Sequence, residues 1–569
     1  MARSIPFGAR LLPGLRGGLR VLRNDLNGVT VHSTLRTPPP FRRGAVTPVG
    51  GHLARGQAAL DGEFHHFGQS LVVAPDALWT TPLPSERFAG WLHGFDWFGD
   101  MAALSDSPTV ASRAGEYVDY WIAEYGRYNR FAWQPAILAR RAYAWLLHWD
   151  PLLVETAPHR RRSMIRQVRY LLRTRHRLPP GMPQLYAHIA FALLSFRVGR
   201  EDLLIYAQNN LGRVLGEQVL PDGAHISRSP ETTLEVLRIL MGLDDLFDQH
   251  GIVPSLAHIR AMDRLAPMLA FFTHTDGGLA AFQGGGEGDR SLLAAVTAPL
   301  NGRPFTYAPH ARYQRMERGH TRVIMDVGGP APFPSDGKAH LAPLAFEMSA
   351  PCGRIVVNCG WSPAQPDSWR EAVRRTPAHS TLAIDGRDAG RFGDPDDIAT
   401  PYAGSPVTRG PGQVHVERRE ADQGIVIEAT HAGYVPTFGR VHTRRLFLAE
   451  HGGDLRGEDT LRVPAGHMSA LHAPRRAQLR FHLHPDVRVR PPSDDRRLEL
   501  AVEDQTWAFL LGGSAASLSV EESAYLATGA RPQPTRQIVV SAPVHDDQEL
   551  RLAWAFKLRS DDKTVLPRA

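Results

Sequence analysis

Two histidines, His340 and His379, stand at the starts of neighbouring apolar runs in the second half of the chain. These runs, Leu344–Met348, Arg354–Cys359 and Thr381–Ile384, have the composition of β-strands. An imidazole carried into such a sheet needs a partner, because burying a polar group unpaired costs about 2–7 kcal/mol. The spacing therefore predicts a shared polar site at the two histidines. The alternative interpretation is that both are surface histidines at the ends of loops.

The composition is that of a soluble globular protein with more than one domain. A length of 569 residues is too great for one hydrophobic core, and 43% of the residues are apolar and 22% charged. The net charge of +7 rests on arginine, with clusters at Arg160–Arg162 and Arg173–Arg177. These clusters are either solvated helix faces or a surface that attracts acidic polymers through its field. No zinc-finger spacing or aromatic-interleaved basic module accompanies them, so we expect no nucleic-acid partner.

Cysteine usage and the N-terminus bear on the compartment. Cys352 and Cys359 bracket one apolar run and lie too far apart along a strand for an easy disulfide, so we expect buried thiols. The N-terminus has several arginines but no continuous apolar core or small-residue cleavage site, which argues against a secretory signal. No run approaches the roughly 18–20 apolar residues of a membrane span. The sequence itself therefore predicts a cytoplasmic chain with no transmembrane segment.

The elements that must position these residues fall into three parts. Residues 1–60 are rich in Pro, Gly and Arg and predict a poorly structured lead-in. Residues 61–305 have apolar residues at helical spacing, and residues 306–569 alternate apolar and polar residues. About eight antiparallel helices and some fourteen strands predict an α+β multidomain fold, an N-terminal α/α toroid followed by a large antiparallel β-sandwich. The helices after the first are expected at Ala111–Tyr125, Ala136–Trp149, Pro158–Thr174, Gln184–Val198, Glu201–Glu217, Pro230–Gln249 and Ser255–Phe272.

A glycine-rich stretch, residues 273–312, joins the helical part to the strands. Its motif GGGEGD lacks the Lys-Ser/Thr of a phosphate loop and follows no strand, so it predicts a turn rather than a nucleotide site. We expect this turn to lie beside a ligand groove.

Several segments, taken in order, resemble the heparinase II/III-like family of polysaccharide lyases. They cover the chain from about residue 84 to its end, and each is weak alone. The segments are Pro221–Leu237 (PDGAHISRSPETTLEVL), AHLAPLAFEMS with GRIVVNCG, RRTPAHSTLAIDG, Thr430–Leu448 (THAGYVPTFGRVHTRRLFL), and GEDTL with RFHLHPDV.

The resemblance implies β-elimination on a uronic-acid polysaccharide. In that reaction the carboxylate is neutralised, a base removes the C5 proton and an acid protonates the leaving oxygen. The carried-over acid/base candidates are His188, His225 and Tyr434, with Arg228 as the partner of the substrate carboxylate; Gln184, Tyr186 and Lys338 are substrate-binding candidates. The alternatives are that His225 and Arg228 cap the helix turn at Pro230, and that Tyr434 packs over a hairpin.

The resemblance also implies a structural divalent metal, zinc or calcium, in the sandwich. His340, Asn358 and His379 stand at its ligand positions, but Lys338 replaces the first His of the family's His-x-His and Asn358 replaces an Asp. Zinc prefers nitrogen, sulfur and anionic oxygen ligands, so the asparagine favours a hydrogen-bonded polar cluster over a metal site. No other cofactor is expected.

Two functions follow from the resemblance. The first is a polysaccharide lyase, a carbon–oxygen lyase, acting on an anionic cell-envelope glycan or exopolysaccharide. The second is a catalytically impaired glycan-binding or envelope-assembly protein, to which Lys338, Asn358 and Thr232, the last in place of a tyrosine, point. Both take an anionic polysaccharide as partner. Such a partner implies the periplasm or envelope, in conflict with the missing signal, and the oligomeric state is not predicted.

Overall fold

The computed structural model describes residues 39–44, 50–104, 107–153, 157–300, 304–332, 335, 337–393, 404–465, 472–473, 475–513, 516–545 and 548–559. These residues form two compact units. The first holds the described residues up to Gln218 together with Glu235–Asp263, and the second holds Val219–Leu234 and the described residues from Arg264 onward, apart from 397–403. The predicted domain limits at residues 60 and 305 stay predictions, and most of the expected lead-in lies outside the described residues.

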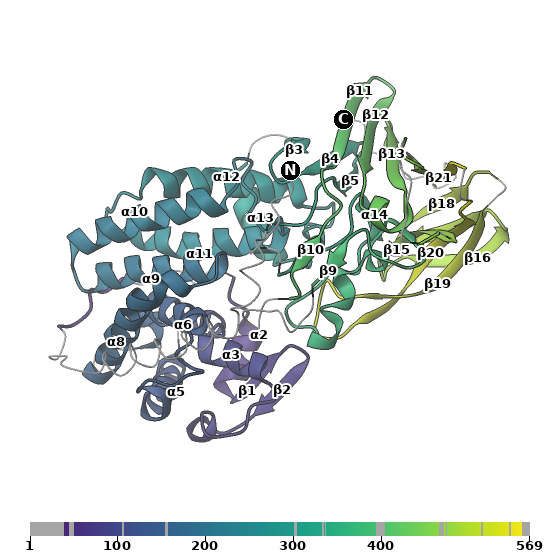
Figure 1. Cartoon of the computed structure of the whole chain (residues 1–569). Coiled ribbons are helices and arrows are strands. Elements are labelled where there is room, and N and C mark those ends of the chain that lie inside the picture. Colours follow the sequence, from purple (N-terminus) through teal and green to yellow (C-terminus); the bar gives the residue numbers. More distant parts are fainter. Residues whose placement is uncertain are drawn as a thin grey trace. The chain divides into compact units, whose positions relative to one another are not determined.

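The first unit is helical, as predicted, and the helices lie side by side in Figure 1. Two of them, α11 and α12, run from one unit into the other. The helices are α2 (Leu53–Leu60), α3 (Glu86–Gly94), α4 (Phe98–Ala102), α5 (Pro108–Tyr125), α6 (Pro135–Leu147), α7 (Trp149–Leu152), α8 (Pro158–Thr174), α9 (Met182–Arg197), α10 (Glu201–Gln218), α11 (Pro230–Gln249) and α12 (Leu256–Phe272).

Helix starts follow the chemistry of the sequence. Proline occupies the first turn of several helices, where its missing N–H costs no hydrogen bond and its fixed φ suits the helix. The hydroxyl of Ser85 caps α3 by accepting from the N–H of Phe88 at 3.2 Å. Buried tryptophans fill the space between the early helices, and Trp121 meets Trp145 edge to face at 5.5 Å. These aromatic rings belong to the core.

The second unit contains two large antiparallel sheets, which confirms the predicted sandwich. Within the described residues the first sheet has nine strands, in the order β19-β20-β15-β7-β6-β5-β4-β3 with β8 paired to β15. Its strands are β3 (Tyr307–Ala308), β4 (Tyr313–Arg318), β5 (Thr321–Asp326), β6 (Phe346–Ala350), β7 (Gly353–Val357), β8 (Leu382–Ile384), β15 (Arg476–Leu483), β19 (Ser517–Tyr525) and β20 (Gln533–Pro543).

The second sheet has eight strands among the described residues, in the order β11-β12-β13-β14-β21-β18-β17-β16. These strands are β11 (His415–Ala421), β12 (Gly424–His431), β13 (Val441–Ala449), β14 (Asp454–Arg462), β16 (Arg488–Asp494), β17 (Arg497–Val502), β18 (Gln505–Leu511) and β21 (Leu550–Leu558). The two sheets share one apolar core, in which Phe346 of β6 stacks on Trp554 of β21 with ring centroids 5.6 Å apart.

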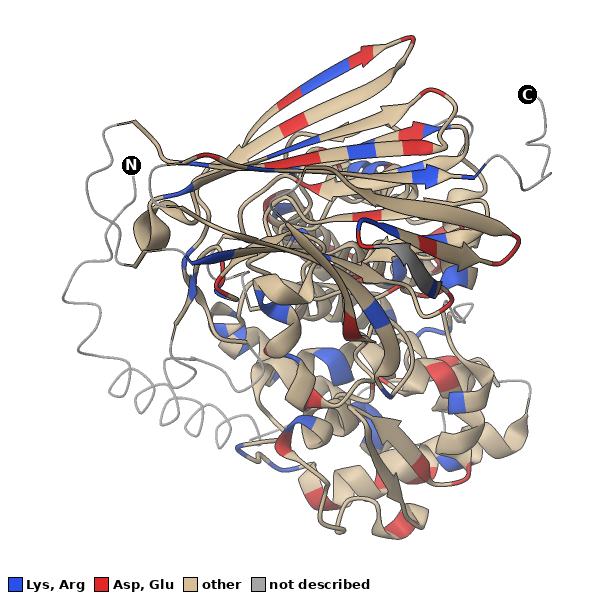
Figure 2. Ribbon diagram, turned by 90° about the vertical axis from the view of Figure 1, so that its right-hand side faces the viewer, with Lys and Arg blue, Asp and Glu red and all other residues tan. Residues whose placement is uncertain are grey.

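Charges of both signs are interspersed along the strands rather than gathered by sign (Figure 2). The outermost strand of the second sheet, β11, has the sequence HVERREA and is mostly exposed. In the register with β12, Glu417 lies opposite Glu428 and Arg419 opposite Val426. Charged side chains on an outer strand keep that edge solvated.

The structure adds elements that the sequence pattern did not predict. These are α2 in the expected lead-in, α13 (Arg290–Thr297) in the glycine-rich stretch, α14 (Val435–Phe438), and the short strand pair β9 (Arg391–Phe392) and β10 (Val407–Arg409). A hairpin, β1 (Glu63–His66) with β2 (Gln69–Val72), precedes α3. Both cysteines are free, buried thiols, as predicted. Among the described helices, none combines the length and apolarity needed to cross a membrane.

Candidate functional site

In the second unit several predicted site residues surround one glycine-rich loop, Gln283–Gly288. The N–H of Gly284 donates to Nε2 of His340 at 2.7 Å, and Oε1 of Gln283 accepts from the N–H of His340 at 2.9 Å. A side chain does not fit in this loop at Gly286, where a Cβ would lie 2.2 Å from a backbone carbonyl oxygen. The loop predicted as a turn beside a groove therefore fixes His340 from two sides.

Arg228 reaches the same loop through a buried carboxylate. Its guanidinium forms an ion pair with Asp326, and its Nε donates to the carbonyl oxygen of Ala311 at 2.8 Å. The second oxygen of Asp326 accepts from Nε2 of Gln283 at 2.7 Å. Arg228 is only 5% exposed and Asp326 only 2%. The predicted partner of a substrate carboxylate is thus bound to a carboxylate of the protein itself.

His225 lies in a closed environment beside Lys338. Its Nδ1 is 2.8 Å from the hydroxyl of Ser227 and accepts the N–H of Ser227 at 3.1 Å. Burial, and after it the charge of Lys338, lower the pKa of His225 to about 3. Lys338 is exposed, so it is the cation of this cluster that reaches solvent. An imidazole with so low a pKa is neutral at pH 7 and is a weak base for removing a C5 proton.

The rings of His340 and His379 lie together, with centroids 4.6 Å apart. Their hydrogen bonds occupy most of the nitrogen lone pairs that a metal ion would need. His340 uses the lone pair of Nε2 to accept from Gly284, so its proton is on Nδ1. Nε2 of His379 lies 2.9 Å from the carbonyl oxygen of Val373 and must carry its proton, and Oδ1 of Asn358 accepts from the main chain at 3.0 Å. Of the nitrogens of the two rings only Nδ1 of His379 keeps a lone pair, and Asn358 offers a neutral amide oxygen in place of a carboxylate, so these residues do not fit zinc or calcium. Elsewhere in the described part of the chain, no group of three or more His, Cys, Asp or Glu side chains could hold a metal ion.

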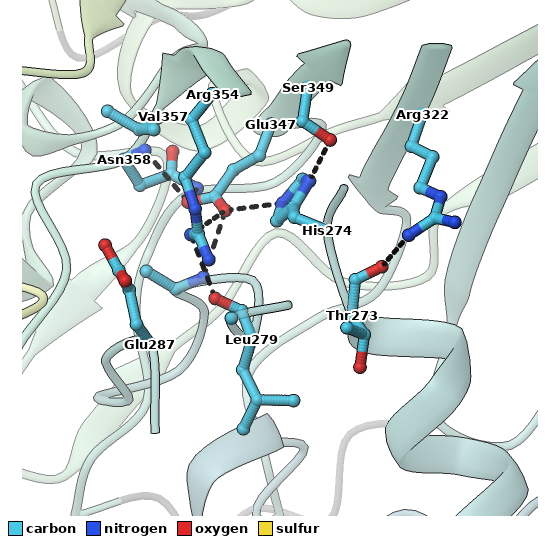
Figure 3. A network of polar contacts seen from close by, with 12 residues as sticks. Thr273, His274, Leu279, Glu287, Arg322, Glu347, Ser349, Arg354, Val357 and Asn358 are labelled. Atoms are coloured by element: carbon cyan, nitrogen blue, oxygen red, sulfur yellow. Dashed lines mark hydrogen bonds and ion pairs between the residues drawn. The ribbon is translucent and has the colours of Figure 1, made fainter. Parts of the chain in front are cut away.

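Asn358 belongs to a buried hydrogen-bond network centred on Glu347 (Figure 3). Oε1 of Glu347 accepts from both the N–H and the Nδ2 of Asn358 at 3.0 Å, and Oε2 accepts from Nε2 of His274 at 3.1 Å. Nη1 of Arg354 lies 3.8 Å from the same carboxylate and completes its surroundings. Burial opposes the charge of Glu347, yet the hydrogen bond from His274 and the charge of Arg354 hold its pKa below the usual range.

Replacing Asn358 with aspartate is expected to destabilise the protein by about 2–4 kcal/mol, because a second carboxylate would face Glu347 at the 3.0 Å that the amide now spans. Urea unfolding at pH 7.5 measures the change in the free energy of unfolding. Asn209→Asp, on the exposed surface of α10, is the matched control and should cost less than 0.5 kcal/mol. A variant N358D as stable as the parent, or one stabilised by added zinc or calcium, would contradict this account.

Tyr434 packs in the sandwich rather than facing a ligand. It is fully buried, and its hydroxyl donates to the carbonyl oxygen of Leu382 at 2.8 Å. Burial raises the pKa of its phenol above the ordinary value of 10. The nearby His431 belongs to a buried chain: its Nε2 lies 3.1 Å from Nδ1 of His442, whose Nε2 lies 2.7 Å from Oδ1 of Asp459.

Asp459 is the centre of that chain and lies directly opposite Arg444 in the register of β13 and β14. Its Oδ1 accepts from Nε of Arg444 at 2.8 Å, and its Oδ2 accepts from Nε1 of Trp554 at 2.9 Å. Arg444, His442 and Asp459 are all fully buried. The segments VHTRRLFL and GEDTL, which carry part of the family resemblance, therefore meet as a structural network inside the sandwich.

The remaining candidates, Gln184, Tyr186 and His188, belong to the first unit. All three lie on α9, which has no polar face of its own and is buried along most of its length. Gln184 accepts from Nε2 of Gln218 at 3.1 Å, whereas His188 has a buried Nδ1 with no hydrogen-bond partner. Burial lowers the pKa of His188 to about 4.

Tyr186 takes part in a polar cluster that the sequence pattern did not predict. Its hydroxyl donates to Glu235, whose carboxylate also accepts from Nη2 of Arg238 at 2.7 Å. A second pair, Arg140 with Asp96 at 2.9 Å, acts electrostatically on Tyr186 and Glu235. The cluster draws on α6, α9, α11 and the turn between α3 and α4, and its charged side chains are 22–42% exposed. It is a polar cluster that solvent partly reaches.

The structure therefore gathers His225, Arg228, Lys338 and His340 around one loop, places Tyr434 in the core of the sandwich and keeps Gln184, Tyr186 and His188 in the helical unit. The residues missed from the sequence are Asp326, Glu347 and Asp459, which hold these groups in place. A signal existed for Glu347 alone, as a lone acid within the apolar run LAFEMS.

Comparison with known proteins gives the family. Residues 301–555 match the family model described as heparinase II/III-like, C-terminal. The chain is 32% identical over 512 residues to FtsZ-localized protein C of Caulobacter vibrioides (strain NA1000 / CB15N), an alignment that spans 88% of this chain and 87% of that protein.

Solved structures give the same fold. Heparinase III matches with a TM-score of 0.68 at 12% identity, covering 96% of this chain and 90% of that one. A mutant of the heparan sulfate lyase HepC from Pedobacter heparinus matches with a TM-score of 0.61 at 14% identity, covering 97% and 90%. Chondroitinase AC lyase matches with a TM-score of 0.51 at 9% identity, covering 95% and 82%. At these identities the likeness shows the fold alone.

Proposed function

We propose, from the premise that this chain belongs to the heparinase II/III-like family, that it binds an acidic glycan of the cell envelope and has lost the β-elimination chemistry. The observation that carries the proposal is the state of the predicted catalytic groups. Arg228 is paired with Asp326, and the hydroxyl of Tyr434 is bonded to a main-chain carbonyl in a buried site. A lyase needs such groups free to meet the substrate.

The substituted positions support loss of chemistry rather than loss of fold. Thr232 stands where the family has a tyrosine, and its hydroxyl is buried. Asn358 serves as a hydrogen-bond bridge to Glu347. The glycan-facing cation of this proposal is Lys338, the exposed member of the loop cluster, with the partly exposed Glu231 near the same loop.

The relative from Caulobacter suggests the process in which such a protein works. Its name places that protein with FtsZ, and the alignment covers nearly the whole of both chains. We extend this to the present chain as an envelope-assembly protein that works with FtsZ. Such a role fits a glycan-binding assembly factor better than a degradative enzyme.

The test is a turnover assay paired with a binding assay on the full chain. With heparan sulfate, hyaluronan, chondroitin sulfate and alginate between pH 5.5 and 9, we expect no rise in the ultraviolet absorbance of unsaturated uronate. Binding of at least one of these polymers should weaken about threefold in Lys338→Ala and with added salt. Arg260→Ala, an exposed cation on α12, is the control and should leave binding unchanged. Uronate absorbance above that of a heat-inactivated sample would overturn the proposal.

The second candidate is an active polysaccharide lyase, and one observation favours it. The cluster of Tyr186, Glu235 and Arg238 offers a tyrosine held by a carboxylate beside a partly exposed guanidinium. Such a group could hold the carboxylate of a uronate, and the same assay decides the matter. Turnover that Tyr186→Phe abolishes, with Tyr143→Phe as the control, would establish the lyase instead.

A further inference from the structure

The first unit also contains an apolar pocket. It is bounded by α8, α9 and α10 and has a volume of about 150 Å³. Residues from all three helices line it, among them Val168, Leu172, Phe191 and Leu203. We call it the α8–α10 pocket. A cavity of about 150 Å³ lined by aliphatic and aromatic side chains holds a group the size of benzene, which is one large apolar side chain.

The pocket opens to solvent at α10. Leu203 is 42% exposed and Tyr206 is 55% exposed, although both line the pocket. Ile205, on the same helix but outside the pocket lining, is 61% exposed. The two exposed lining residues, Leu203 and Tyr206, form the apolar mouth of the pocket, which favours contact with another apolar group.

One polar atom inside the pocket lacks a partner. His188 lines the pocket and is 6% exposed, and its Nδ1 makes no hydrogen bond. A buried polar atom left unsatisfied destabilises the protein, and a bound group with a donor or acceptor would remove that cost. The imidazole is neutral at pH 7, so it offers a hydrogen bond rather than a charge.

The surroundings of the pocket are strongly basic. Residues 157–200 contain ten arginines and no acidic residue. Arg175 lines the pocket, and Arg169 and Arg173 are exposed on the adjoining α8. Acidic groups begin only with Glu201 and Asp202 at the start of α10, and Asp202 is paired with Arg200 at 2.6 Å. The field at the mouth of the pocket therefore favours an anionic partner.

We infer that the α8–α10 pocket is a docking site for an acidic peptide segment of a partner protein, which inserts one large apolar side chain. The volume limits the inserted group to a single side chain, and the arginines select acidic residues on either side of it. The inference rests on the proposed assembly function, in which the partner belongs to the FtsZ apparatus.

The first experiment measures binding of the full chain to purified FtsZ polymers by co-sedimentation. Ala207→Phe fills the pocket from α10, and Arg175→Glu reverses the charge at its lining without touching the core. Each is expected to weaken binding about tenfold or more. Ile205→Ala and Arg260→Glu are matched controls on exposed positions outside the lining, and both should bind as the parent does.

The second experiment uses 3-phenylpropionate, a benzene ring carrying one carboxylate, as a probe of the pocket alone. Its binding should shift the imidazole NMR signals of His188 in the parent and in Ile205→Ala but not in Ala207→Phe. If FtsZ binds and the two pocket variants bind it equally well, the docking site is wrong and the assembly function stands. If FtsZ does not bind, the assembly function fails, and the NMR signals of His188 test the pocket separately. His188 signals that 3-phenylpropionate leaves unchanged would overturn the pocket as well. A shift of those signals that Ala207→Phe abolishes would keep the pocket as a site for acidic apolar groups.

Discussion

Acidification from pH 7.5 to pH 5 is expected to unfold the protein cooperatively, with a midpoint near pH 5. Of the 26 histidines, eleven are buried in the described part of the chain, and burial lowers the pKa of each. Seven have folded pKa values of about 3 or 4: His93, His148, His188, His225, His258, His379 and His482.

The way in which the free energy of unfolding changes with pH follows from the direction of these pKa shifts. Above pH 6.5 the folded and unfolded chains both hold these imidazoles neutral, so the histidines do not lower the free energy of unfolding. Below pH 6.5 the unfolded chain takes up protons that the folded chain does not, and each histidine lowers the free energy of unfolding by about 1.4 kcal/mol per pH unit. At this slope the seven residues with pKa values of about 3 or 4 together remove about 15 kcal/mol by pH 5, which reaches the upper end of the roughly 5–15 kcal/mol of a typical domain.

Urea unfolding followed by circular dichroism at pH 7.5, 6.5 and 5.5 measures this slope. His379→Gln keeps a donor toward the carbonyl oxygen of Val373 and cannot titrate, so it should reduce the slope by up to one proton. His415→Gln is the control, because that side chain is exposed and meets water in both states. A free energy of unfolding that stays constant from pH 7.5 to pH 5 would refute the prediction.

Asp459→Asn is expected to cost about 3–5 kcal/mol, the largest effect of any single substitution considered, because it leaves a buried guanidinium without its counter-charge. Asp459 faces Arg444 across two strands, and it also receives hydrogen bonds from His442 and Trp554. All of these side chains lie in the sandwich core. Differential scanning calorimetry and urea unfolding at pH 7.5 measure the loss.

The double variant Asp459→Asn/Arg444→Met separates the pair from its surroundings. It should recover much of the loss, because an apolar side chain of similar length removes the uncompensated charge. Asp454→Asn, at the first position of β14, is a matched control whose partner Arg456 is 58% exposed, and it should cost less than about 1 kcal/mol. A loss below 1 kcal/mol in Asp459→Asn would mean that the network carries no net charge interaction.

Much of the fold could be predicted because local chemistry and tertiary structure agree in it. Helices α8 and α11 match their predicted ranges at both ends, since a proline in the first turn and regular apolar spacing mark them. Helix α13 was missed although Asp289 caps it, because its short apolar run lies in a stretch dominated by glycine. Element type was readable wherever a segment was long enough to show a period.

The candidate site was less predictable because its partners are chosen in three dimensions. Arg228 and Asp326 are 98 residues apart, and nothing local to either marks the other. The same is true of His340, whose partner is a main-chain N–H in a loop 56 residues earlier. Residue types identified which groups were capable of chemistry, whereas burial and pairing decide which of them remain available for it.

The exposed outer strand β11 affects whether copies of the protein pair with one another at high local concentration. Where many copies of the protein gather, their sheets come close together, and an open sheet edge is a template for strand addition. To pair there, a second copy would have to strip water from the glutamates and arginines of HVERREA. The charged edge thus lets the chain crowd without fibrillising, so that neutralising Glu417 and Arg419 together would endanger solubility long before it disturbed the sandwich.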